Sequence, residues 1–333
     1  MRARLAREAK IIEVLPTMFS VLIRVIGVLL MLTALAIPLA RAPDLAVETL
    51  VARWAPPPSD FIEVKGQLVH LRDEGPRADA APIVLLHGTA ASLHTWEGWV
   101  KALRSQRRII TLDLPGFGLT GPFAGQYARD DYRGDVLARF VIDVLDQLAV
   151  PHFVIGGNSL GGELAWRIAA LAPQRVQRLI LVNASGTRFD SESAPLALML
   201  AHIPGVRRIP EYLLPRALVA QSVASLYGDP ARVTSELIDR YYELMLREGN
   251  RRALGQLMRQ LESGQDVAHI AALKLPTLIL WGRRDALIPV AQAAEFKRLI
   301  VGSELVIFDE LGHVPQEEDA PRTVAEVRRW LGL

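Results

Sequence analysis

Short apolar runs separated by helical stretches recur along the chain from residue 61 onward. The runs span residues 61–64, 68–72, 82–88, 108–116, 152–159, 178–186, 276–285 and 304–313. The first two surround Gly66 and predict a hairpin. Most of the others are apolar throughout, which is typical of strands buried on both faces of a parallel sheet. The chain is therefore predicted to be α/β, and polar residues at the strand ends should converge where such sheets bind ligands.

One long interval, residues 187–275, contains no strand pattern. Within it, Asp229-Pro230 is a helix-start signal, and apolar residues follow at helical spacing. The earlier stretch 195–219 is apolar and interrupted by prolines. The interval is predicted to be a helical cap inserted between two strands of the sheet, with 195–219 as its lid.

The N-terminal region has a different pattern. Residues 18–40 are apolar apart from Arg24, and four basic residues lie between positions 2 and 10. The run can cross a bilayer if Arg24 reaches the nearer interface. Because basic residues stay on the cytoplasmic side, we expect an apolar anchor helix with the N-terminus cytoplasmic and the catalytic domain outside, periplasmic or extracellular. Two alternatives are a cleaved signal peptide, whose cleavage pattern Ala34-Leu35-Ala36 fits, and a buried helix of a soluble protein.

Three consecutive prolines at 56–58 predict a stiff spacer, and we place a domain boundary there. The expected units are 1–54, an N-terminal anchor or signal segment with the start of the linker; 55–186, the first part of the core; 187–275, the cap; and 276–333, the second part of the core. No chemical motif lies in the first unit, so it is expected to serve location and to be dispensable for chemistry.

Composition limits the function classes. The 333 residues are 50% hydrophobic, carry a net charge of +2 and include no cysteine. The small net charge argues against a nucleic-acid partner. The lack of cysteine excludes disulfides, cysteine-ligated zinc and a cysteine nucleophile. No cofactor or metal is indicated, and the expected partners are a small, hydrophobic ester or acyl compound and, through the N-terminal helix, a membrane.

The candidate nucleophile is Ser159. The sequence Gly157-Asn158-Ser159-Leu160-Gly161 fits the pattern G-x-S-x-G at the end of an apolar run. In a very tight strand-to-helix turn, the residues two before and two after the serine crowd each other, and glycine removes the clashing Cβ atoms. The following helix offers free N–H groups to an anion. The alternative is an ordinary glycine-rich turn.

A serine nucleophile needs a base and an acid that orients it, in the chain order serine, acid, histidine. Asp285 ends the strand run 276–285, and His313 follows the last run in a loop after Gly312. Taken singly, Asp285 could be a helix cap and His313 a structural loop histidine. Their order and their positions at strand ends favour the triad Ser159, Asp285 and His313. Asn183 ends the preceding strand, but an amide cannot stabilise an imidazolium as a carboxylate does.

The negative oxygen of a tetrahedral intermediate needs two preset donors. We expect these to be the backbone N–H groups of Leu160 and of Thr89, which follows the run ending in His87-Gly88. His87 is interpreted as a structural brace of this oxyanion loop. Asp113, also at a strand end, is expected to brace the turn "LPGFG".

The blocks "LLHGTAAS", "DLPGFGLT", "GNSLGG", "WGRRDALIP" and "LGHVPQEE" resemble those of the α/β-hydrolase fold superfamily over residues 61–333. The resemblance implies an eight-stranded, mostly parallel sheet flanked by helices. "GNSLGG" and "WGRRD" are similar to blocks of esterase- or lipase-like members and of meta-cleavage product hydrolases. Related epoxide hydrolases and haloalkane dehalogenases use aspartate where this chain has Ser159. Meta-cleavage enzymes usually carry a glycine-rich oxyanion loop, and this chain has "TAAS".

The leading hypothesis is a carboxylic ester hydrolase that works through an acyl-enzyme. The alternatives are a carbon–carbon bond hydrolase of the meta-cleavage type and a cofactor-free haloperoxidase-like enzyme. A non-catalytic ligand receptor on the same fold belongs to a different class, because a fold alone does not determine function. A receptor would be expected to lack a triad member, and all three are present here.

Overall fold

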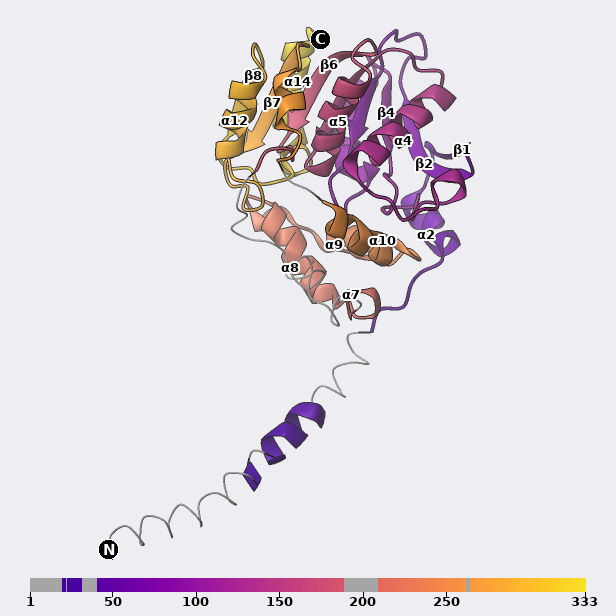
Figure 1. Ribbon diagram of the computed structural model, residues 1–333, viewed down its shortest axis with the longest axis vertical. Coiled ribbons are helices and arrows are strands. Elements are labelled where there is room, and N and C mark those ends of the chain that lie inside the picture. The colour runs from indigo at the N-terminus through magenta and orange to yellow at the C-terminus, as the bar shows by residue number, and fades with distance from the viewer. Residues whose placement is uncertain (1–19, 22, 32–40, 189–208, 262–263) are drawn as a thin grey trace, which may run out of the picture.

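A computed structural model describes residues 20–21, 23–31, 41–188, 209–261 and 264–333 (Figure 1). Residues 20–21 and 23–31 are helical, with exposed apolar side chains. Within the described ranges, no helix has both the length and the apolar character needed to cross a membrane. The rest of the predicted segment 18–40, and the part of the predicted lid before residue 209, lie outside the described residues.

The core of the protein is an eight-stranded sheet with the order β1-β2-β4-β3-β5-β6-β7-β8. Strands β3 to β8 are mutually parallel, whereas β2 pairs antiparallel with both β1 and β4. The predicted eight-stranded, mostly parallel sheet is therefore confirmed. The strands are β1 (Ser59–Val64), β2 (Gln67–Glu74), β3 (Ile83–Leu86), β4 (Ile109–Leu112), β5 (Phe153–Asn158), β6 (Val176–Val182), β7 (Thr277–Gly282) and β8 (Glu304–Phe308).

The local sequence explains these strands. The hairpin turn places Lys65 and Gly66 at φ of 52° and 84°, the two positive values that a two-residue hairpin turn needs. Every residue of β3, β4, β5 and β7 is buried, as expected for apolar strands covered on both faces.

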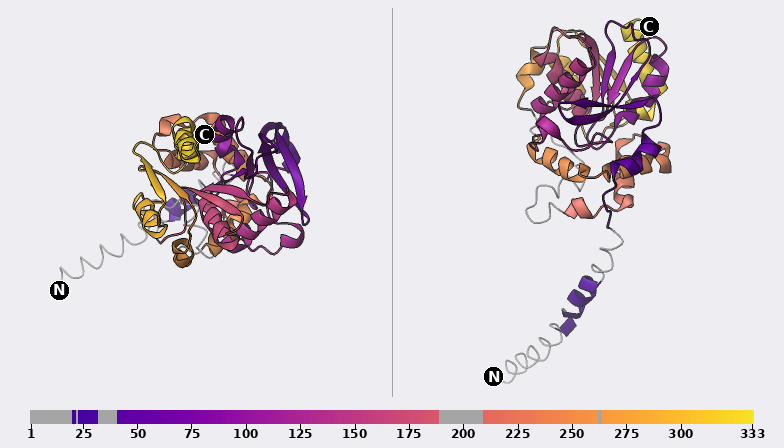
Figure 2. Two further views of the ribbon diagram at one scale, coloured as in Figure 1. Left: turned by 90° about the horizontal axis from the view of Figure 1, so that it is seen from above. Right: turned by 90° about the vertical axis from the view of Figure 1, so that its right-hand side faces the viewer.

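Helices cover both faces of the sheet (Figure 2, left). One apolar cluster joins the sheet to α4, α5 and α12, and a second joins it to α3 and α14. The second includes the adjacent rings of Trp96 and Trp99, whose centroids are 5.0 Å apart. These core helices are α3 (Glu97–Leu103), α4 (Gly134–Gln147), α5 (Leu160–Leu171), α12 (Ala291–Leu299), α13 (Pro315–Glu318) and α14 (Ala320–Leu331).

The segment between β6 and β7 contributes helices that lie across one end of the sheet (Figure 1). Helices α9 (Ser235–Met245) and α10 (Asn250–Gln260) are amphipathic, and α9 begins where Thr234 Oγ1 accepts the Leu237 N–H. The Asp229-Pro230 signal instead caps a short 3₁₀ turn at Pro230–Arg232. The described helices of this cap are α7 (Ile209–Tyr212), α8 (Arg216–Leu226), α9 (Ser235–Met245), α10 (Asn250–Gln260) and α11 (Val267–Ala271).

Residues 41–54, which we name the strap, lie against the cap. Ala42 N donates to Tyr212 O at 3.1 Å, and Leu45 exchanges backbone hydrogen bonds with Leu246 and Glu248. The strap ends in α2 (Val47–Trp54), whose Leu50 and Trp54 are buried with core and cap residues. The sequence-based boundary after residue 54 therefore does not separate the strap from the folded body, because these apolar side chains complete its packing.

Polar contacts reinforce the strap. Trp54 Nε1 donates to Glu243 of α9 at 2.7 Å, and Arg53 pairs with the same carboxylate. Asp44 pairs with the buried Arg251 of α10 at 2.6 Å. An exposed ion pair contributes little, but the Glu243 carboxylate and the buried Arg251 guanidinium each lose a partner if the strap is removed.

We predict that deleting residues 1–40 and deleting residues 1–54 have different effects. The first deletion leaves the strap intact and should keep the melting temperature nearly unchanged. The second removes the buried Leu50 and Trp54 and should lower it strongly, because Trp54→Ala alone should cost about 3 kcal/mol in the free energy of unfolding. Urea unfolding measures this, with Val301→Ala, whose side chain is 81% exposed, as the neutral control. Equal stability of the two truncated chains would contradict the prediction.

Candidate active site

Ser159 lies between β5 and α5, in a backbone conformation that few residues adopt. Its φ is 54° and its ψ is −119°. A Cβ built on Gly157 would lie 2.1 Å from Gly161 O, and one built on Gly161 would lie 2.1 Å from Leu86 O. Any side chain at either position would therefore push strands or helix apart, so the two glycines permit the turn. Ser159 is only 7% exposed, because the cap covers this end of the sheet.

His313 and Asp285 are hydrogen-bonded to each other. His313 Nδ1 lies 2.8 Å from Asp285 Oδ2, which orients the ring so that Nε2 is the nitrogen left for a substrate or nucleophile. Asp285 Oδ1 also accepts the N–H groups of Leu287 and Ile288, at 2.8 and 2.9 Å. The carboxylate thus caps the following turn and holds the imidazole at the same time, so both sequence interpretations of Asp285 describe real contacts.

Asn183 has a role that the sequence did not indicate. Its Nδ2 donates to Asp285 Oδ2 at 2.6 Å, and its Oδ1 accepts the Gly282 N–H at 3.1 Å. Asn183 stands at φ 43°, at the end of the strand beside the one that carries Asp285. The sequence showed that Asn183 ends a strand. It did not show that the Asn183 amide donates a hydrogen bond that holds the Asp285 carboxylate in place.

The backbone of the histidine loop is held from three sides. Asn158, the residue before Ser159, donates from Nδ2 to His313 O at 2.9 Å, which brings the loop beside the serine. His313 N donates to Leu226 O of the cap at 2.7 Å. Glu318 accepts the Gly312 N–H at 2.8 Å and also the N–H groups of Gly228 and Asp229 at 3.0 and 2.9 Å. Glu318 therefore joins the histidine loop to the end of α8.

No hydrogen bond joins Ser159 Oγ to the His313 ring among the residues that the structure describes. Such contacts are often long in the absence of substrate and shorten when substrate binds. The structure thus combines an imidazole oriented by Asp285 with a strained serine whose neighbour Asn158 binds the histidine loop.

The loop after β3 approaches Ser159 closely. A Cβ built on Gly88 would lie 3.1 Å from Ser159 Cβ. Within the described chain, neither the Thr89 N–H nor the Leu160 N–H has a hydrogen-bond acceptor. Thr89 follows the glycine that approaches Ser159 and Leu160 follows Ser159 itself, so the two residues with unpaired N–H groups in the described chain flank the close contact.

His87 braces this loop. Its Nδ1 lies 2.7 Å from Gly88 O, and its Nε2 accepts the Leu114 N–H at 2.9 Å. Burial lowers the pKa of His87, so the ring is neutral, with the proton on Nδ1. Both nitrogens are thus occupied by backbone groups, and His87 joins the ends of β3 and β4.

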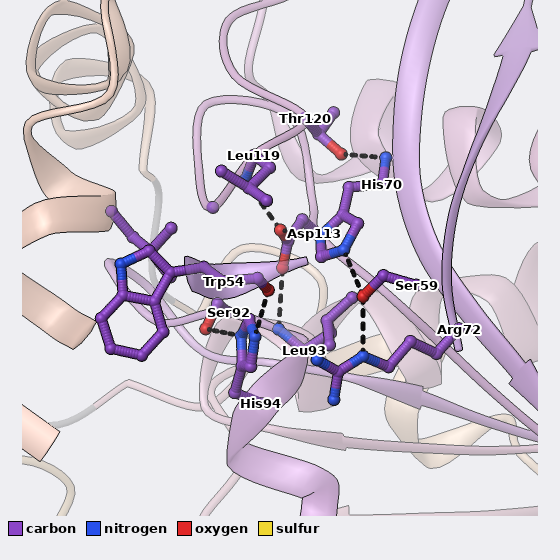
Figure 3. A network of polar contacts seen from close by, with 12 residues as sticks. Trp54, Ser59, His70, Arg72, Ser92, Leu93, His94, Asp113, Leu119 and Thr120 are labelled. Atoms are coloured by element: carbon purple, nitrogen blue, oxygen red, sulfur yellow. Dashed lines mark hydrogen bonds and ion pairs between the residues drawn. The ribbon is translucent and has the colours of Figure 1, made fainter. Parts of the chain in front are cut away.

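Asp113 is the centre of a separate buried network (Figure 3). Its carboxylate accepts the N–H groups of Leu93 and Leu119, both at 2.8 Å, and contacts His70 Nδ1 at 2.7 Å. Burial alone would raise the pKa of Asp113, but the charge and hydrogen bond of His70 outweigh it and hold the pKa well below its usual range. Asp113 therefore secures the segment after the oxyanion loop as well as the expected turn.

The network continues to the strap. His94 Nε2 donates to Trp54 O at 2.8 Å, and its Nδ1 faces Ser92 Oγ at 2.9 Å. Burial is the main cause that lowers the pKa of His94 to about 4, which leaves the ring neutral. On the other side, His70 Nε2 contacts Ser59 Oγ, which also accepts from Arg72 Nε, both at 2.9 Å. Because Ser59 lies in an ordinary strand, this second Asp–His–Ser chain is a structural one.

A profile of the alpha/beta hydrolase fold matches residues 81–320, more than half of the chain. The chain belongs to the alpha/beta hydrolase fold family. This hydrolase is 31% identical over 274 residues to a dihydrolipoyllysine-residue acetyltransferase component of the acetoin cleaving system of Pseudomonas putida, covering 81% of this chain and 68% of that protein. It is 28% identical to a 2-hydroxymuconate semialdehyde hydrolase of Pseudomonas sp. strain CF600, covering 75% and 86%.

Solved structures give the same family. The meta-cleavage product hydrolase of Pseudomonas fluorescens IP01 superposes with a TM-score of 0.69 at 26% identity, covering 82% of this hydrolase and 97% of that chain. Among the residues described for this hydrolase, no group of three or more His, Asp or Glu side chains is placed to hold a metal ion.

We predict that Asp285→Asn mainly lowers kcat, whereas Asp113→Asn mainly lowers the free energy of unfolding. Asp285→Asn should lower kcat by about 10⁴-fold, because an amide stabilises the wrong histidine tautomer. Asp113→Asn should keep kcat within about tenfold but lower the free energy of unfolding by about 3 kcal/mol, because it breaks a fully buried pair. Steady-state kinetics and urea unfolding at pH 7 separate the two. Equal losses of kcat would contradict the assignment of Asp285 as the orienting acid.

The Asp113 effect on stability should depend on pH. The folded-state pKa of Asp113 is depressed, so its stabilisation is present above the unfolded-state value of about 3.9 and is lost as pH falls below it. The difference in unfolding free energy between the native chain and Asp113→Asn should therefore shrink between pH 5 and pH 3. A constant difference over that range would show that the carboxylate charge does not stabilise the network.

Proposed function

We propose that this protein is a serine hydrolase of uncharged carboxylic esters. The single observation that carries the proposal is the strained Ser159 turn beside an imidazole oriented by Asp285. Ser159 Oγ attacks the ester carbonyl while His313 Nε2 takes its proton. The oxyanion binds the N–H groups of Leu160 and Thr89, and one such donor contributes about 3–4 kcal/mol to the transition state. His313 then protonates the leaving alcohol, and water releases the acid from the acyl-enzyme.

The surroundings favour an uncharged acyl group. Ala91, near the oxyanion loop, and Val314, next to His313, belong to one apolar cluster with Val219, Val223 and two tyrosines of the cap. Arg240 of α9 lies nearby with a side chain that is 12% exposed, but Glu317 and the hydroxyl of Tyr241 occupy the same contact, so its charge is already compensated. Apolar burial adds up to about 0.8 kcal/mol for each methylene of a substrate.

A second candidate is hydrolysis of a carbon–carbon bond in a dienoate-like diketone. It is favoured by the similarity of this chain to two Pseudomonas proteins, a 2-hydroxymuconate semialdehyde hydrolase and a meta-cleavage product hydrolase. Such a substrate carries a carboxylate, for which a compensated Arg240 is a poor partner.

The decisive measurement compares ester substrates of different acyl length, and the native chain with Ser159→Ala. We expect the full-length chain to hydrolyse p-nitrophenyl esters, with kcat/KM rising as the acyl chain grows from acetyl to hexanoyl, and to add one fluorophosphonate as judged by intact mass. Ser159→Ala should lose both activities with unchanged circular dichroism. Turnover of a 2-hydroxy-6-oxo-dienoate with no ester hydrolysis would make the second candidate correct. Ester hydrolysis above one-tenth of the native rate in Ser159→Ala would remove the serine mechanism.

We further propose that the N-terminal segment anchors the enzyme, with the catalytic domain on the outer side of the membrane. Support comes from the exposed apolar side chains of residues 21 and 23–31 and from the basic residues ahead of them. The full-length chain should stay with membranes in alkaline carbonate, whereas a chain lacking residues 1–40 should not. Release of the full-length chain would contradict anchoring, and a mature N-terminus after residue 36 would identify a cleaved signal peptide.

A further inference from the structure

A small cavity lies beside the oxyanion loop, where the cap meets the sheet domain. Ala90 and Ala91 form one wall, Phe117 of the "LPGFG" turn another, and Leu244 and Met245 of α9 with Asn250 of α10 the third. The cavity has a volume of about 10 Å³, which is room for one water-sized group. It is therefore a space for a single small substituent and not for a whole substrate.

Asn250 is the one polar side chain among the residues that line this cavity, and it is 3% exposed. Its Nδ2 donates to Gly118 O at 3.0 Å and to Leu244 O at 2.8 Å. Because both partners are carbonyl oxygens, they can contact only the NH₂ group, and the orientation of the amide is determined.

The other amide atom, Asn250 Oδ1, is buried and has no donor in the part of the chain that the structure describes. A buried acceptor left unpaired costs about 1–3 kcal/mol, so buried polar atoms in folded proteins nearly always have a partner. The other lining residues are apolar or glycine and offer no side-chain donor, so a bound molecule in the cavity could supply the missing partner.

The cavity is close to the reacting centre. Ala90 follows Thr89, one of the two proposed oxyanion donors, and stands at φ 58°, in a loop that approaches Ser159 at Gly88. Ala91 lines the cavity and also packs with Val314, next to His313. A substrate whose carbonyl occupies the proposed oxyanion site would thus lie close to this cavity.

We propose that Asn250 Oδ1 accepts a hydrogen bond from a hydroxyl group on the acyl part of the substrate, so that hydroxyacyl esters are the preferred substrate class. This inference rests on the proposed ester hydrolysis. A hydroxyl has the size of the cavity and supplies the donor that Oδ1 lacks. A carboxylate does not suit the site, because its oxygens would face another acceptor among apolar groups. Sites that bind a substrate hydroxyl discriminate strongly against analogues that lack it.

The test separates binding from catalysis. Full-length Ser159→Ala, which cannot turn over ester, is titrated calorimetrically with methyl butanoate and methyl hexanoate and with their 3-hydroxy and terminal-hydroxy counterparts. We expect one hydroxylated ester of each length to bind about tenfold more tightly than its plain partner. Adding Asn250→Leu should abolish this ratio. Met245→Leu, which changes the cavity wall without removing the acceptor, should change both affinities and retain the ratio.

Equal affinity for plain and hydroxylated esters at every position in Ser159→Ala would overturn the proposal and leave the cavity as a site for water only. This comparison uses no substitution at Asn250, so it holds even if Asn250→Leu does not fold. A native chain that hydrolyses neither ester, together with a retained hydroxyl preference in Ser159→Ala, would refute ester hydrolysis while supporting the subsite. Retention of the ratio in folded Asn250→Leu would assign the preference to another group and reject Asn250.

Discussion

The architecture of the site depends on a close contact between backbone segments at the Ser159 turn. The contact leaves no room for a side chain at Gly157 or Gly161. Strand β3, strand β5 and helix α5 meet so closely there that a Cβ at Gly157 or Gly161 would lie 2.1 Å from a carbonyl oxygen. At this contact Ser159 has a positive φ, and among the described residues the first N–H of α5 has no acceptor. Neighbouring packing must hold such strain, and here β3 and β6 on either side of β5 do so.

The same constraint explains why the surrounding loops are tied by so many polar contacts. Parallel strands bring their carboxyl ends together, but the loops that follow them must still be oriented. His87 and Asp113 fix the loops after β3 and β4, Asn183 fixes Asp285 after β7, and Glu318 fixes the loop after β8. Each of these side chains forms hydrogen bonds with backbone N–H or C=O groups. The loops that carry the candidate catalytic residues are therefore held in place by a rigid backbone frame.

The sheet could be predicted from the sequence because its information is local. Apolar runs of strand length, Gly66 in a hairpin and two glycines around Ser159 each report their own conformation. The assignment of Asp285 and His313 rested on their order in the chain and on their positions at strand ends. The contacts of Asn183 and Glu318 could not be predicted in this way, because Asp285 lies 102 residues from Asn183 and Gly228 lies 90 residues from Glu318. Spacing along a sequence carries no signal for pairs of that kind.

The strap also makes contacts that its own sequence does not predict, because its partners are distant in the chain. Residues 41–54 follow an apolar segment and precede three prolines, so composition grouped them with the linker. Their amphipathic pattern was short, and its partners on α9 and α10 lie near residues 243–251. Only the folded chain brings Leu119 of the sheet domain and Leu244 of the cap together as the surface that buries Leu50 and Trp54.

The route of the strap has a mechanical consequence. The chain enters the folded body at the cap, through short backbone pairings of Ala42 with Tyr212 and of Leu45 with Leu246, before it reaches β1. Tension applied to the N-terminal side would therefore load the cap first and the sheet last. Because Leu226 of α8 also holds the His313 backbone, the cap lies on the path by which a pull on the N-terminal segment would reach the imidazole.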